Sequence, residues 1–184
     1  MPDSPPVPNL TNVLIYTRPR RRDAGSDKEE TTATKDEVRI VELGPMRVAA
    51  ALGFGPQPET DAWEELLTWA LATNLLDGTQ RFFGFNNPSP MPGSPNYGYE
   101  QWMTVGPDVE ALGDIEIKDC EGGLFAVLRC SGLATIGEDW ERLAAWLEAG
   151  PYRLDDRQCL EELLSSPMLP HTEWVFDLYA AISR

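Results

Sequence analysis

The sequence predicts an α+β fold of two tandem strand–helix–strand–strand modules, related by a pseudo-twofold axis and joined in one antiparallel sheet. Three observations predict it. Residues 38–105 match residues 115–182 at a constant offset of 77 positions, without a gap. Aromatic residues recur at this offset, as Trp63 and Trp140 do. In each copy the apolar period changes from about 2 to about 3.6 and back, which is typical of strands that flank one helix.

Composition is that of a globular domain with an acidic surface. The chain has 184 residues, of which 42% are apolar and 24% charged, and its net charge is −15. Residues 38–184 contain 23 acidic and 9 basic side chains. Such a surface repels nucleic acid phosphates and attracts cations. The balance therefore argues against nucleic acid binding by this chain alone.

Targeting and metal signals are missing from the sequence. No apolar run approaches the roughly 20 residues that span a bilayer, and the first residues do not read as a secretory signal. Three cysteines lack metal-ligand spacing, and His171 is the only histidine. These features predict a cytoplasmic protein with free thiols, no membrane segment, no metal and no cofactor.

Residues 1–37 form a separate N-terminal extension that we expect to be partly flexible. They are rich in Pro, Ser, Thr and charge, so they have little to bury. Residues 13–16 are apolar enough for one strand, and residues 18–22 form a basic cluster that a solvated tail explains. A single folded domain is expected to occupy residues 38–184.

The first copy is predicted in the following order. Gly44-Pro45 is a turn pair between two strands, and a Gly- and Pro-rich loop ends the second of them. Apolar residues at i, i+3, i+4, i+7 and i+8 from Trp63 then predict an amphipathic helix. Two strands separated by a turn-rich loop complete the copy. The predicted ranges are strands 38–43 and 46–52, helix 60–73, strand 81–85, loop 86–95 and strand 96–105.

The second copy repeats this order after a linker at 106–114. Strands are predicted at 115–119 and 123–129, and a helix follows through residues 136–147. Residues 152–164 are less regular, and we expect a strand that runs into a short helix. The last strand is predicted at 173–182.

Alternation along the two long strands divides their side chains between two faces. One group is expected to point at the helices: Tyr97, Tyr99, Trp174, Phe176 and Leu178. The other group is expected to point away from them: Glu100, Trp102, Asp177 and Tyr179. With both helices on one face, the second face is expected to form an aromatic groove that contains acidic groups.

Several runs of this chain resemble the GyrI-like small-molecule-binding domain, which is also the effector-binding domain of bacterial multidrug-responsive transcription activators. The resemblance covers about 38–182, and the order and spacing of its runs are its most specific feature. In the first copy it rests on residues 38–48, 83–88 and 97–102. In the second it rests on residues 122–127, Trp140, residues 160–162 and residues 176–179.

The resemblance implies a ligand site between two modules, with aromatic walls and a buried glutamate, that binds lipophilic and often cationic aromatic compounds. One branch of the family, with a Tyr-Glu-x-Trp strand, resembles hydrolases that open the cyclopropane ring of DNA-alkylating natural products. Residues 99–102 fit that strand. No segment of the chain reads as a helix-turn-helix, so direct transcriptional control is not expected.

Three functions remain open from the sequence. The first is a binding module for multidrug sensing or sequestration, the second is a hydrolase of strained electrophiles at the same site, and the third is a protein-interaction module of gyrase-inhibitor type that uses the acidic surface. In a hydrolase, Glu100 or Glu161 would be the general base. The ligand-binding candidates are Glu100, Trp102, Tyr97, Tyr99, Glu161, Asp177, Tyr179 and Trp174.

Overall fold

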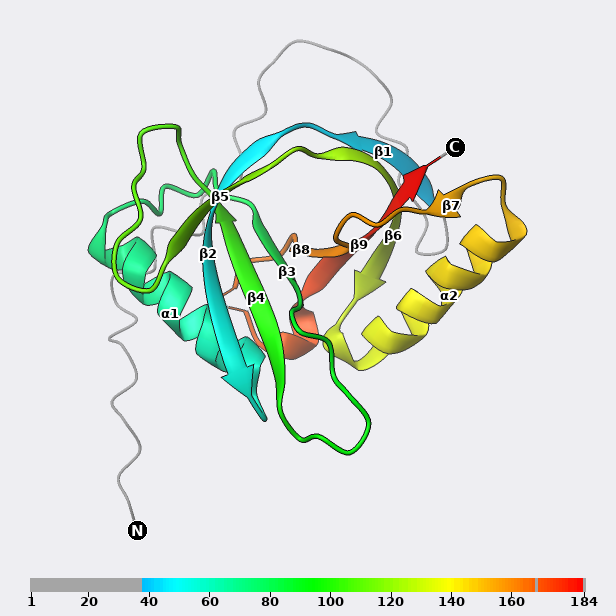
Figure 1. The fold of residues 1–184 in the computed structure, drawn as a ribbon, viewed down its shortest axis with the longest axis horizontal. Coiled ribbons are helices and arrows are strands. Elements are labelled where there is room, and N and C mark those ends of the chain that lie inside the picture. The colour runs from blue at the N-terminus through cyan, green and yellow to red at the C-terminus, as the bar shows by residue number, and fades with distance from the viewer. Residues whose placement is uncertain (1–37, 168, 184) are drawn as a thin grey trace.

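A computed structural model describes residues 38–167 and 169–183 of the chain. Nine strands and two α-helices lie in this part, and the strands form one curled antiparallel sheet (Figure 1). The predicted fold class is confirmed. The predicted strand at 13–16 and the basic cluster at 18–22 lie outside the described residues.

Both copies contain the same main elements in the same order, and the second has one additional short strand, β7. The first consists of β1 (Arg39–Leu43), β2 (Met46–Gly55), α1 (Pro58–Ala72), β3 (Phe82–Asn86) and β4 (Tyr97–Thr104). The second consists of β5 (Glu116–Cys120), β6 (Gly123–Ser131), α2 (Ile136–Ala149), β7 (Arg153–Leu154), β8 (Leu160–Leu163) and β9 (Val175–Ser183), with short 3₁₀ turns at Leu133–Thr135 and His171–Glu173. α1 begins at a proline, which suits a first helical turn. Residues 152–164 contain β7 and β8 but no helix, although we expected a strand there that runs into a short helix.

The first strand of each copy pairs with the other copy. β1 does not form a hairpin with β2: it pairs with β6, and β5 pairs with β2. The sheet order is therefore β1-β6-β9-β8-β3-β4-β2-β5, which reads as two equivalent halves that meet at β8 and β3. Because each half supplies a strand to the other, neither half completes its own part of the sheet.

The strand exchange also curls the sheet. β1 and the start of β6 arch from one side of the molecule to the other in Figure 1. The two crossovers are the connections that carry the chain from one half to the other, between β1 and β2 and between β5 and β6. They touch, since a Cβ on Gly122 would lie 2.1 Å from the carbonyl oxygen of Leu43. Side chains from both halves meet inside the curl, where Phe83 and Phe125 both pack against Tyr179. The face expected to be an open groove is therefore filled, because the sheet closes over it.

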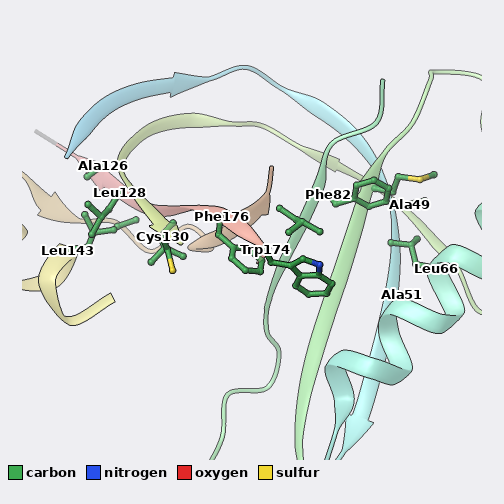
Figure 2. Close-up of a cluster of buried hydrophobic side chains, with 14 of the residues drawn as sticks. Ala49, Ala51, Leu66, Phe82, Ala126, Leu128, Cys130, Leu143, Trp174 and Phe176 are labelled. Atoms are coloured by element: carbon green, nitrogen blue, oxygen red, sulfur yellow. The ribbon is translucent and has the colours of Figure 1, made fainter. Parts of the chain in front are cut away.

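The helices cover opposite ends of the other face. α1 packs on β2 and β4, whereas α2 packs on β6. Figure 2 shows this larger core, with Leu66 of α1 at one end, Leu143 of α2 at the other, and Trp174 and Phe176 between them. The middle of the face, over β3 and β8, therefore lies between the two helices. In the described residues, no helix is long and apolar enough to cross a membrane.

Arg157 ties the second crossover to the sheet. Its guanidinium donates hydrogen bonds to the carbonyl oxygens of Gly122, Leu124 and Ile182 at 2.9, 3.2 and 2.9 Å. Gly123 leaves room for it, since a Cβ there would lie 1.8 Å from Arg157 Nη1, and its φ of 126° disfavours any other residue. Gly123 thus allows three carbonyl oxygens from two backbone segments to share one cation.

We expect Gly123→Ala to lower the free energy of unfolding by about 1–3 kcal/mol, because it strains the backbone and displaces Arg157. Gly44→Ala is the matched control, since nothing lies within 4 Å of a Cβ there, and it should change stability by less than about 0.5 kcal/mol. Urea unfolding measures both. Equal effects would show that the Arg157 contacts do not hold the crossover.

Candidate functional site

The predicted site residues divide between the two faces of the sheet. Tyr97, Tyr99, Trp174 and Glu161 lie on the face that carries the helices, while Glu100, Trp102, Asp177 and Tyr179 lie on the curled inner face. The strand register causes this division, because residues of odd number in β4 face the helices and residues of even number face inward. The candidate residues therefore form two separate clusters, one on each face of the sheet.

Glu161 stands at the pseudo-twofold axis on the helix face. β3 pairs with β8 so that Gly84 lies directly opposite Glu161. These two residues are also equivalent positions of the two copies. The axis therefore passes between a residue without a side chain and a carboxylate, and the site departs from symmetry at its centre.

The space above Gly84 is occupied by Tyr99. A Cβ at position 84 would lie 2.2 Å from the Tyr99 hydroxyl oxygen, so only glycine allows this ring position. From there, the Tyr99 hydroxyl donates to Glu161 Oε2 at 2.9 Å. On the other side, Trp140 Nε1 of α2 donates to Glu161 Oε1 at 2.9 Å. Each oxygen of the carboxylate thus accepts a hydrogen bond from a neutral aromatic side chain.

Burial raises the pKa of Glu161, and its two hydrogen bonds only partly offset this effect. The nearby carboxylate of Glu59 raises the pKa further. Burial also raises the pKa of Tyr99 well above its usual value, and the charge of Glu161 adds to the shift. No hydrogen bond or ion pair in the described residues joins Glu161 to a cation. Its negative charge therefore lacks a basic partner within this part of the protein.

Further aromatic side chains extend the site along the helix face. The ring of Trp63 in α1 lies 5.4 Å from that of Phe82 and 6.1 Å from that of Trp174. Tyr97 donates to Glu59 Oε1 at 2.6 Å, and this bond raises the pKa of Tyr97 to about 12. The result is a helix face with several aromatic rings and two carboxylates. We call Glu161, Tyr99, Trp140, Tyr97, Glu59, Trp63 and Trp174 the Glu161 site.

On the inner face, Glu100 is neutralised within the protein. Its Oε1 accepts hydrogen bonds from Lys118 Nζ and Trp102 Nε1, both at 2.5 Å, and its Oε2 accepts one from Asn87 at 2.9 Å. Burial by itself would raise the pKa of Glu100, but these three bonds outweigh burial and lower it. Glu100 is thus a satisfied buried anion.

The other inner-face carboxylates are also paired. Asp177 binds Arg129 at 2.6 Å and Arg39 at 2.8 Å. The neighbour of Glu161, Glu162, binds Arg81 at 2.6 Å and accepts a hydrogen bond from Tyr179 at 2.7 Å. Asp177 and Tyr179 are 4% exposed. The inner face is therefore a network of paired charges.

Sequence reasoning did not select Trp140, Asn87 or Lys118 as site residues. Trp140 belonged to the predicted helix stripe, and an apolar stripe does not show which indole N–H meets a carboxylate. Lys118 reaches Glu100 only because β5 pairs with β2 of the other copy. In the described residues, no group of three or more His, Cys, Asp or Glu side chains is arranged to hold a metal ion.

Comparison with known proteins identifies the family. The sequence matches the GyrI-like small molecule binding domain over residues 36–183. The chain belongs to the GyrI-like family. A search of curated proteins gave no match for this GyrI-like chain.

Solved structures share the fold of this GyrI-like domain at low identity. The C-terminal domain of EcmrR is 13% identical, with a TM-score of 0.65, covering 80% of this chain and 98% of that one. A hydrolase from Listeria innocua is 14% identical, with a TM-score of 0.62, covering 82% and 94%. SAV2435, solved with bound tetraphenylphosphonium, is 9% identical, with a TM-score of 0.52, covering 80% and 94%.

The raised pKa of Glu161 makes a prediction about stability. A carboxyl whose pKa is higher in the folded than in the unfolded chain costs stability as pH rises from the unfolded value to the folded one. Glu161→Gln removes this cost and keeps an acceptor for one donor. Relative to the wild type, the variant should therefore gain stability as pH rises above about 4.5. Urea unfolding from pH 4 to pH 8 measures the difference.

The neighbouring residue offers a matched control with the opposite sign. Glu162→Gln leaves Arg81 without its carboxylate partner, so it should lower stability at neutral pH. If Glu161→Gln also lost stability throughout this pH range, Glu161 would be paired in a way that the geometry does not show.

Proposed function

We propose that this chain binds lipophilic, aromatic cations at the Glu161 site. The observation that carries the proposal is the carboxylate without a basic partner: Glu161 is half-buried and accepts hydrogen bonds from two neutral donors, Tyr99 and Trp140. A carboxylate that is partly removed from water without a cation beside it is unfavourable, and a cationic ligand would relieve that cost. The site thus has an electrostatic reason to accept a positive charge from outside.

The aromatic side chains suit the rest of such a ligand. A cation above the face of Trp, Tyr or Phe gains about 0.5–2 kcal/mol for each well-placed ring. Trp63, Trp174 and Tyr97 supply such rings on the same face of the sheet. Stacking and charge attraction impose few exact hydrogen bonds, so several cations of different shape would bind. This breadth fits multidrug sensing or sequestration.

The comparisons support the same class of ligand. The family is described as a small-molecule-binding domain. The SAV2435 structure contains tetraphenylphosphonium, a lipophilic aromatic cation. We assign ligand contact to the helix-face candidates, Tyr97, Tyr99, Glu161 and Trp174. We assign the inner-face candidates, Glu100, Trp102, Asp177 and Tyr179, to the support of the sheet, because their polar groups are already partnered.

Titration with tetraphenylphosphonium tests the proposal. We expect it to quench tryptophan fluorescence and to bind the Glu161→Gln variant at least about tenfold more weakly, because a partly buried charge pair is worth more than about 1.4 kcal/mol. Affinity for the cation should also fall as pH drops through the raised pKa of Glu161, since the carboxyl then becomes neutral. A neutral triphenyl compound should show neither effect.

Glu100→Gln is the matched control on the inner face. Its effect on cation affinity should be small, because Lys118 already neutralises Glu100. If Glu100→Gln weakened binding and Glu161→Gln did not, the ligand would sit on the inner face. If tetraphenylphosphonium and other aromatic cations failed to bind at all, the proposed function would be wrong.

A second function, hydrolysis of strained electrophiles, is favoured by the raised pKa of Glu161. An ionised carboxylate of raised pKa is a suitable general base. It would take a proton from water as the water oxygen attacks a cyclopropane carbon. The ring C–C bond would break, and its electrons would move to the conjugated carbonyl oxygen, which then takes up a proton. Tyr99 and Trp140 would hold the carboxylate in place.

Mass spectrometry after incubation with a cyclopropane-bearing alkylator tests this second function. If it holds, a product heavier by one water should accumulate with the wild type and fall by about 100-fold or more with Glu161→Gln, since a general base contributes about 10²–10⁴ in rate. Glu100→Gln should retain activity. Binding without product would leave the sequestration function and remove the hydrolase.

A further inference from the structure

The second half of β2 has a free edge. β4 pairs with β2 from Val48 to Gly55, but β5 on the other side pairs only from Met46 to Ala50. In the described part of the chain, no other strand pairs with β2. In Figure 1, β4 lies along one side of the lower end of β2, and no strand lies along the other side. Residues 51–55 therefore form an edge strand.

The backbone of two residues faces outward along this edge. The backbone carbonyl oxygen of Arg47 accepts a hydrogen bond from the Val105 amide at 2.9 Å. The backbone N–H and C=O groups of the odd-numbered residues of β2 therefore point toward β4. Backbone groups alternate along an antiparallel strand. The N–H and C=O groups of Leu52 and Phe54 therefore point away from β4, to the side where β5 has ended. Two donors and two acceptors are presented there.

The side chains of the same two residues are exposed and apolar. Leu52 is 54% exposed and Phe54 is 63% exposed, and both project from the inner-face side of β2. The eight residues from Val48 to Gly55 contain no charge, although the chain carries a net charge of −15. Edge strands usually carry charged side chains that prevent pairing with another chain, and this edge has none.

The second copy provides an internal comparison. Among the described residues, β6 has the same free edge, because β1 pairs with it only up to Val127. The positions equivalent to Leu52 and Phe54 are Arg129 and Ser131, and Arg129 is ion-paired with Asp177. The duplicated fold therefore protects one free edge with polar residues and leaves the other apolar.

We propose that two copies of this chain associate through their β2 edges, in an antiparallel pairing centred on Gly53. In this register Leu52 lies opposite Phe54 of the partner subunit. The twofold axis makes the second pair, Phe54 opposite Leu52 of the partner subunit, identical to the first. Both pairs have outward N–H and C=O groups, so four intermolecular hydrogen bonds form. Each pair also places a leucine beside a phenylalanine on one face, which is a favourable cross-strand contact.

A second copy fits this edge because the pairing is self-complementary. A twofold dimer needs one surface that matches itself, and residues 52–54 do so in both hydrogen bonding and side-chain type. Two acidic chains repel each other over most of their surface, whereas this uncharged strand lets their backbones approach. The inference does not depend on the ligand site, which lies on the other face of the sheet.

Sedimentation of the full chain at high micromolar concentration tests the dimer. We expect the wild type to have the mass of two chains and Phe54→Lys to have the mass of one, with unchanged circular dichroism. Leu112→Lys is the matched control, since Leu112 is equally exposed at 63% but lies in the linker, and it should remain a dimer. A monomeric wild type, or a dimeric Phe54→Lys variant, would overturn the proposal.

Cross-linking tests the register. In a Cys120→Ser, Cys159→Ser background, a mixture of the Leu52→Cys and Phe54→Cys variants should form a disulfide between the two variants, because these positions face each other across the axis. Each variant alone should cross-link much less. Preferential cross-linking within either variant alone would contradict pairing centred on Gly53.

Discussion

The exchange of first strands between the two halves is the constraint on which the rest of the structure depends. β1 completes the second half and β5 completes the first, so the sheet must curl until its two crossovers touch. The curl buries one face and leaves the other to the helices. It also brings Lys118 to Glu100 and Arg39 to Asp177, so the charges of each half are balanced by side chains of the other.

Carboxylates on the two faces of the sheet have different kinds of partner, and this difference indicates the candidate binding site. Glu100, Glu162 and Asp177 each contact a basic side chain on the inner face. These anions can be buried because a basic side chain of the protein compensates each charge. Glu161 is adjacent to Glu162 in sequence yet points to the opposite face, where its partners are neutral. One step along a strand therefore separates a structural anion from a candidate binding anion.

The fold could be predicted further than the site. The constant offset and the change of period gave the order of the elements and which face each long strand turns to the helices. The exchange of first strands could not be predicted, because Gly44-Pro45 is as compatible with a crossover as with a hairpin. That exchange decides what covers Glu100. From the sequence, both Glu100 and Glu161 were ligand-binding candidates, and only their three-dimensional partners separate them.

The features on which both proposals rest lie where the two copies have diverged. At the axis, Gly84 and Glu161 are equivalent positions, and the glycine lets Tyr99 reach the glutamate. At the edges, apolar Leu52 corresponds to ion-paired Arg129. A symmetric duplicate would place two carboxylates against each other at the axis, at a high electrostatic cost. Divergence removes that conflict, and it leaves one charge, with aromatic side chains from both halves around it.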